Sequence, residues 1–477
     1  MKRSLLVIGL LLWIGAEAWA IPPFARRYKT ACQTCHVIIP KLNTFGEAFR
    51  LNGYRIPEED EAFIKDEPLS QGADQWRDLF PQAIWPADIA GMPPIGLRII
   101  SDLEVTDAES DGRRMNFEFP YEFEILSGGR IGDQIGFFAE VEWKQQGVAE
   151  IKQTYMVVND FLGWLGVPEK LVNLRVGLMD LQHLLSYSNV TRAGKSHPLW
   201  GNLKLSDYTM GTAAANIRSD VGFRLQDNQP AIELYSIAFK RLLLAVGWAT
   251  GNGEARFDND THKDIYYKVK LKLFGRDFHG RVEEETTSTD TKSSGGWVDN
   301  SILLEHFGYF GAAPAADAAN NAVTAGNKHP QSSFNFLGGA IRGLYENLDL
   351  SVGAVWGHYD DPWGTSSRED TDTFTWFAKA EYQFLPWLMG RVVYESFVMD
   401  EPDDVAKLFR PAATLEKAGW TYNAALDRSR ILYGPVIALR SNIAIRVEHE
   451  LYLEHDGADR ARMDKPSAFW LRLDFAW

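Results

Sequence analysis

The chain has 477 residues, of which 45% are hydrophobic and 13% aromatic, and its formal net charge at pH 7 is -15. This acidity argues against nucleic acid as a partner. Beyond the N-terminal leader no uninterrupted apolar run reaches about 18 residues, which excludes a helical membrane protein. The length suits two or three soluble domains or one large β-structure.

The N-terminus has the pattern of a secretory signal peptide. Lys2 and Arg3 form a short basic region, an apolar stretch comes next, and Ala18 and Ala20 frame a small-x-small cleavage site. We therefore expect residues 1–20 to be a Sec-type signal peptide and the mature chain to start at Ile21.

Both cysteines of the chain stand in one motif, Cys32-Gln33-Thr34-Cys35-His36. The C-x-x-C-H pattern is typical of covalent c-type haem attachment. Its two thiols add to the vinyl groups of one porphyrin, and the adjacent histidine becomes the proximal iron ligand. A thioredoxin-like redox pair, a disulfide or half of a zinc site are the alternatives. No βαβ context is visible, and no other Cys or His lies between Ile21 and Met92. The motif predicts one covalent haem c.

A short amphipathic helix is expected after the motif. Leu42, Phe45 and Phe49 stand at helical spacing, and Gly53 is placed to end the helix. A domain this small needs the haem as part of its core. We therefore expect residues 21–94 to form a monohaem cytochrome c domain and a linker to the C-terminal part of the chain.

The distal iron ligand is left open by the sequence. Residues 21–91 contain no methionine and no histidine other than His36. Met92 is the first downstream candidate, and a plain apolar linker methionine is the alternative reading of it. His183 and His197, in a long loop further on, are weaker candidates, and a vacant sixth position is a further alternative.

From about Ile95 onward, segments of about ten residues alternate apolar and polar side chains and then break at turn residues. Within residues 374–384 the apolar positions are Phe374, Trp376, Ala378, Ala380, Tyr382 and Phe384, and the polar ones are Thr375, Lys379, Glu381 and Gln383. A soluble β-sandwich also alternates, but its strands share one core. Here each strand carries its own aromatic face and a densely charged opposite face, as in outer-membrane barrels.

The last strand supports the barrel interpretation. The chain ends in "FWLRLDFAW", an amphipathic strand that stops on an aromatic residue. We predict an all-β fold, a transmembrane barrel of about 16 strands over residues 95–477, with the strand count running from 16 to 18. Residues 183–210 are expected to form a long outer loop. Acidic loop residues could attract cations: Asp360, Asp361, Asp403 and Asp404.

The stretch "PPFARRYKTACQTCHVIIPKLNTFGEAFRLNGYRIP" resembles the N-terminus of the fused outer-membrane cytochrome–porin proteins of iron-oxidising bacteria. The matching residues are Pro23, Phe24, Ala25, Arg26, Cys32, Cys35, His36, Leu42, Asn43, Phe45, Gly46, Phe49, Gly53 and Tyr54. One departure is the "VII" after the haem histidine, where the family commonly has an aromatic or polar run. This makes the haem edge more apolar.

The resemblance implies a protein of the outer membrane of a Gram-negative bacterium, surrounded by its lipid, with the haem segment acting as a plug. Cys32 and Cys35 would attach the haem, and His36 would ligate its iron. Electrons would pass between an extracellular donor, Fe(II) or another redox partner, and a periplasmic cytochrome or other soluble carrier. Such a protein would be an Fe(II) oxidase in the loose sense. The alternatives are a haem-plugged diffusion porin, an outward-directed reducing conduit and a haem enzyme such as a peroxidase.

Overall fold

The computed structural model describes residues 23–56, 60–65, 74–83, 94–106, 115–132, 134–144, 147, 149–168, 171–188, 191–202, 223–251, 262–280, 299–314, 331–360, 370–400, 428–453 and 467–477. The predicted signal peptide over residues 1–20 and the candidate ligand Met92 lie outside the described residues. So do three of the acidic loop residues, Asp361, Asp403 and Asp404.

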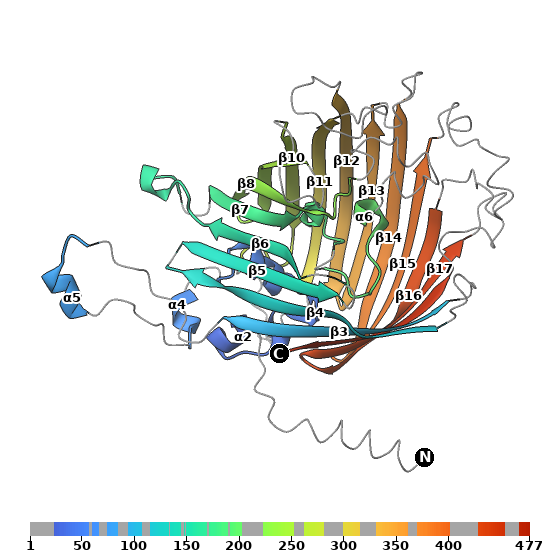
Figure 1. The fold of residues 1–477 in the computed structure, drawn as a ribbon, viewed down its shortest axis with the longest axis horizontal. Coiled ribbons are helices and arrows are strands. Elements are labelled where there is room, and N and C mark those ends of the chain that lie inside the picture. Colours follow the sequence, from blue (N-terminus) through green and yellow to red (C-terminus); the bar gives the residue numbers. More distant parts are fainter. Residues whose placement is uncertain are drawn as a thin grey trace, which may run out of the picture.

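The larger part of the described chain is a closed antiparallel barrel of 16 strands (Figure 1). Its strands are β3 (Ile95–Thr106), β4 (Met115–Ile131), β5 (Ile135–Lys144), β6 (Glu150–Val158), β7 (Asn173–Asp180), β8 (Asn228–Ala238), β9 (Leu242–Ala249), β10 (Asp264–Leu273), β11 (Asp299–Pro314), β12 (Gln331–Glu346), β13 (Leu348–Tyr359), β14 (Thr371–Leu385), β15 (Leu388–Met399), β16 (Arg428–Arg440), β17 (Ile443–Leu453) and β18 (Ala468–Ala476). Consecutive strands are neighbours, and β18 pairs with β3 to close the ring. The predicted fold, an all-β barrel of about 16 strands, is confirmed.

The apolar and polar residues that alternate in the sequence lie on the outward and inward faces of the barrel strands. On β14, Lys379 and Glu381 are buried, whereas Phe374 and Phe384 are 44% and 59% exposed. The exposed face carries large apolar side chains on strand after strand, and the inward face carries charges. This is the surface expected of a barrel surrounded by hydrocarbon, where every backbone group must be paired within the protein.

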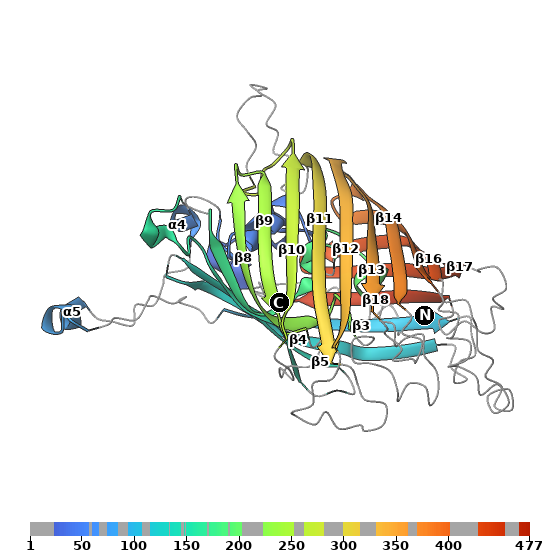
Figure 2. The same ribbon diagram turned by 90° about the horizontal axis from the view of Figure 1, so that it is seen from above.

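Short helices and a small sheet precede and interrupt the barrel. They are α2 (Pro23–Tyr28), η1 (Cys32–Thr34), β1 (His36–Ile38), β2 (Lys41–Leu42), α3 (Thr44–Leu51), α4 (Asp60–Phe63), α5 (Asp74–Leu79), η3 (Gly163–Leu165), η4 (Leu181–Leu184) and α6 (Leu199–Asn202). None of the described helices is long and apolar enough to cross a membrane. In both views α5 lies away from the barrel wall (Figures 1 and 2).

Residues 23–56, here called the inner segment, contact the inward face of the barrel. The Tyr235 hydroxyl of β8 donates a hydrogen bond to the Leu51 carbonyl at 2.8 Å, and the Arg446 guanidinium of β17 donates to the Ile39 carbonyl. Both barrel side chains are buried. Because β8 and β17 belong to different sides of the ring, these contacts place the inner segment within the lumen.

The connection between β7 and β8 also enters the lumen. The sequence predicts a long outer loop here, but its described residues 181–188 and 191–202, called the inner loop, bind inward-facing carboxylates. Ser186 Oγ donates to Glu305 at 2.6 Å, and the backbone N–H of Leu199 donates to Glu395 at 2.9 Å. Buried carboxylates need such donors, so the loop is drawn inward.

Candidate functional site

The C-x-x-C-H motif forms one tight turn. Cys32–Thr34 is a 3-10 helix, and the backbone N–H of Cys35 donates to the Cys32 carbonyl at 3.1 Å. The two cysteines are not joined in a disulfide. Burial raises the pKa of the Cys35 thiol to about 12. Burial raises the pKa of the Cys32 thiol as well, so both thiols are neutral. They lie on the same short turn, which would let both attach to one flat ligand.

His36 is held by its own turn. Its Nδ1 donates to the Pro40 carbonyl at 3.1 Å, which leaves the lone pair on Nε2. Metal-binding histidines commonly donate their other ring N–H to a carbonyl in this way. Burial lowers the pKa of His36 to about 4, so the imidazole is neutral, the form that binds iron.

Cys32, Cys35 and His36 line one cavity of about 1050 Å³. Near the motif its wall is apolar, formed by side chains of the inner segment such as Phe24, Phe45 and Phe49. Pockets for organic cofactors and ligands have volumes of about 300–1,000 Å³ and mostly apolar walls. The two thiols and the neutral imidazole are a donor set that fits haem c, and the cavity offers a space of suitable size with an apolar wall beside them.

Helix α3 packs directly on the motif. Asn43 accepts from the backbone N–H of Gly46 at 2.8 Å, and its Nδ2 donates to the carbonyls of Gln33 and Thr34 at 3.2 and 3.0 Å. One side chain therefore caps the helix and binds the C-x-x-C turn. A Cβ added at Gly46 would overlap the Cys35 carbonyl oxygen, so only glycine permits this approach.

Gly46→Ala is expected to lower the haem content of the protein. The added methyl meets backbone, which must shift, and such overpacking costs about 1–3 kcal/mol. The measurement is bound haem absorbance per mole of folded barrel. Gly343→Ala is the matched control, because a Cβ there meets nothing within 4 Å. Equal haem content in the two variants would contradict the packing role of Gly46.

Buried charges dock the inner segment on the barrel wall opposite β5 and β6. Lys41 Nζ is 2.6 Å from the Asp349 carboxylate and also pairs with Glu381. Lys379 lies 3.1 Å from each of the same two carboxylates, and Arg342 lies 3.0 Å from Asp349. The alternation of β14 predicts that Lys379 and Glu381 face inward, but no local pattern indicates that Lys41 meets them.

The three candidates for the distal ligand lie in different places. Met92 is outside the described residues. His183 does not line the cavity; its Nε2 is 2.9 Å from Glu233, and its Nδ1 is 2.5 Å from the Asp180 carbonyl. His197, which lies in the inner loop, lines the same cavity as His36.

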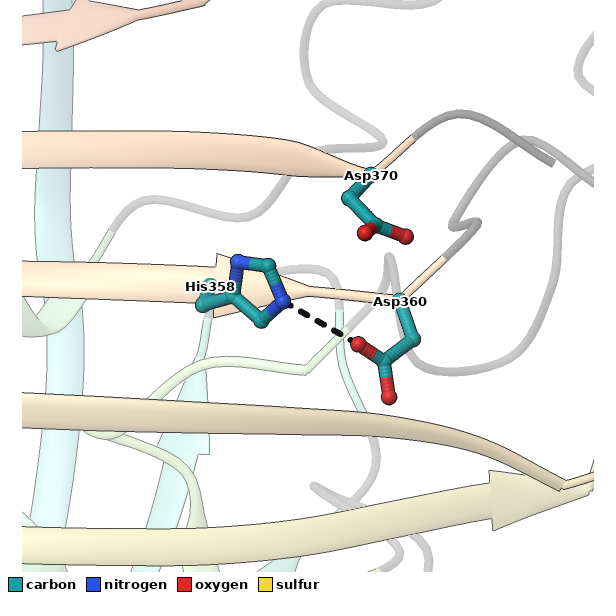
Figure 3. A group of neighbouring side chains, drawn as sticks. All are labelled: His358, Asp360 and Asp370. Atoms are coloured by element: carbon teal, nitrogen blue, oxygen red, sulfur yellow. Dashed lines mark hydrogen bonds and ion pairs between the residues drawn. The ribbon is translucent and has the colours of Figure 1, made fainter.

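A second group of ligand atoms lies where β13 ends and β14 begins (Figure 3). One atom each from His358, Asp360 and Asp370 lies within 4.8 Å of the others, and His358 Nδ1 is 2.6 Å from Asp372. His358 shares the outward face of β13 with Trp356, on which it stacks at 5.7 Å. In the strand order β13 and β14 stand across the barrel from β5 and β6, so this group is no part of the cavity.

The barrel resembles solved porin structures. An anion-selective porin from Comamonas acidovorans superposes with a TM-score of 0.50 at 11% identity, over 80% of this chain and 98% of that one. Two further similar structures are OprB of Pseudomonas putida (TM-score 0.48, 10% identity, 80% and 94% covered) and OmpT of Vibrio cholerae (TM-score 0.47, 10% identity, 80% and 98% covered). No protein-family model and no curated protein matches the sequence. The likeness to the Comamonas porin establishes a porin-like fold.

Proposed function

We propose that the chain is an electron-transfer protein of a Gram-negative outer membrane. One covalent haem c inside the barrel would carry electrons between an extracellular donor, Fe(II), and a soluble periplasmic carrier such as a cytochrome. The observation that carries the proposal is that Cys32, Cys35 and His36 all open onto one cavity within the lumen. Bound there, haem supplies a one-electron Fe(III)/Fe(II) couple.

Different residues of the inner segment would attach the haem, ligate its iron and anchor the segment to the barrel. Cys32 and Cys35 hold the cofactor covalently, His36 presents Nε2 to the iron, and Pro40 fixes the tautomer through Nδ1. Asn43 joins the motif to α3, and Lys41 anchors the segment to the wall. The inner segment is thereby a plug that positions the redox centre inside the barrel.

The cavity extends over a large part of β4. Its wall on this strand runs from Tyr121 to Gly128, which is about 23 Å along the strand at 3.3 Å per residue. The hydrocarbon core of a bilayer is about 30 Å thick. A donor or carrier that entered this cavity would meet the haem directly, so the proposal needs no chain of further haems.

The wall of the cavity carries charges of both signs. Away from the motif, β4 and β5 contribute Glu122, Glu124, Glu140 and Glu142. Arg98 lies 3.0 Å from Glu124, and Arg192 and Lys195 line the same cavity. An Fe(II) donor that entered the cavity would be held on the carboxylate side of this wall, at β4 and β5.

The inner loop packs against the barrel wall, which favours a conduit over a diffusion porin. Tyr187 and Trp200 of the inner loop pack against Phe377 and Phe307 of the wall, with ring centroids 5.0 and 6.0 Å apart. All four side chains are buried. Among the described residues, the inner loop thus fills part of the lumen with apolar side chains.

Liposomes test the proposal. The protein is reconstituted into vesicles that enclose oxidised soluble cytochrome c, and Fe(II) is added outside under anaerobic conditions. The enclosed cytochrome should become reduced, while a ferrous chelator dye enclosed in parallel vesicles stays colourless. Colouring of the dye would show Fe(II) entry and favour the diffusion porin. Reduction only in the reverse direction, from enclosed reduced cytochrome to external Fe(III), would favour the outward conduit.

A further inference from the structure

His197 lines the same cavity as the C-x-x-C-H motif. It comes from the inner loop, about 160 residues after His36, yet both side chains line the same space. Two neighbours in the loop, Arg192 and Lys195, line it as well. The inner loop therefore forms a second wall of the cavity, separate in sequence from the one that carries the cysteines.

The loop holds His197 in place from both sides. Before it, the backbone N–H groups of Lys195 and Ser196 donate to the two carboxylate oxygens of Glu448 at 3.1 and 2.8 Å. After it, the N–H of Leu199 donates to Glu395, and Arg430 donates to the His197 carbonyl itself. These partners are inward-facing and buried, so the imidazole is carried on a fixed backbone.

We infer that His197 is the distal axial ligand of the haem that the motif attaches. The inference rests on the proposed function, since it needs that haem. His183, the other histidine of the loop, does not line this cavity. A pair of imidazoles also gives the site a defined electronic signature: a low-spin ferric iron with a lower reduction potential than a His/Met pair has.

The test is the electron paramagnetic resonance and near-infrared spectrum of the purified, oxidised, haem-containing protein. The wild type and the matched control His183→Gln should both be low-spin. His197→Gln should lose the low-spin signal, and added imidazole should restore it. His197→Met should raise the midpoint potential above that of the wild type.

Several results would overturn the assignment. A wild-type protein that is high-spin, or a His197→Gln variant that stays low-spin with an unchanged potential, rules out His197 as ligand. Loss of the low-spin signal in Met92→Leu but not in His197→Gln would assign the position to Met92. Absence of covalent haem in the wild type would instead refute the proposed function, and the two failures are thus distinguishable. Restoration by imidazole shows that a variant is folded around its haem.

Discussion

A double variant, Cys32→Ser with Cys35→Ser, is expected to fold as a barrel that carries no covalent haem and accepts no electrons from Fe(II). The two thiols are the only cysteines of the chain, so no other residue can form the thioether bonds. Most of the barrel should be unaffected, because its closure depends on strand pairing from β3 to β18. Covalent haem is measured as the haem signal that stays with the protein band after denaturing gel electrophoresis. Folding of the barrel is measured by the difference in gel migration between heated and unheated samples.

Single variants of the motif separate the role of the thiols from that of the histidine. Cys35→Ser leaves one thioether and should retain reduced amounts of covalent haem, whereas His36→Ala should retain the covalent haem and lose its proximal ligand. Full covalent haem in the double variant would show that the motif is not the attachment site. An unfolded barrel in the double variant would show instead that haem attachment is needed for assembly.

The second large effect is expected from Lys41→Glu. The change places a third carboxylate beside Asp349 and Glu381, in a site where the lysine side chain is 3% exposed. Breaking a buried pair by leaving an uncompensated charge costs about 3–5 kcal/mol, which shifts the docking equilibrium of the inner segment by a factor of about 10² to 4 × 10³. The segment should leave the wall, and the conductance of single molecules in planar bilayers should rise from a closed to a porin-like level.

Lys29→Glu is the control for Lys41→Glu. It makes the same charge change in the same segment, at an exposed position. Its conductance should equal that of the wild type. If Lys41→Glu also stays closed while limited proteolysis shows the inner segment released, the inner loop alone closes the pore. A wild-type protein with porin-like conductance would contradict the packed lumen.

The barrel could be predicted from the sequence because its signal is local. Side chains on a strand alternate with a period of two, so the aromatic and charged faces of residues 374–384 are visible without any partner strand. The same holds for the C-x-x-C-H motif, whose five residues are contiguous. The predicted strand number ranges from 16 to 18, because turn positions between Ser219 and His329 are less clearly marked than the strands.

The contents of the lumen could not be predicted, because they depend on contacts between distant residues. Lys41 and Asp349 are separated by 308 positions, and Ser186 and Glu305 by 119. Nothing in the local pattern of the sequence shows that the described residues of this connection, the inner loop, turn inward. The inward-facing carboxylates Glu395 and Glu448 have arginine partners on the wall, Arg430 and Arg391, and also accept backbone N–H groups of the inner loop.

The same reasoning applies to His197. In the sequence it is one of two histidines in a loop, with no spacing that relates it to His36. The structure places it on the cavity and places His183 away from it, because Glu233 of β8 binds the latter. A loop that folds into a barrel can thus line the same cavity as a segment about 160 residues earlier in the chain.

The measurement that tests the central claim most directly is the visible spectrum of the oxidised, purified protein after anaerobic addition of Fe(II) near neutral pH. We predict that the sharp bands of a reduced c-type haem grow in within seconds and fail to do so in the Cys32→Ser, Cys35→Ser variant. Bands that appear only with dithionite would leave the haem in place and contradict electron transfer from Fe(II). No haem bands with either reductant would contradict the assignment of the motif and its cavity to haem.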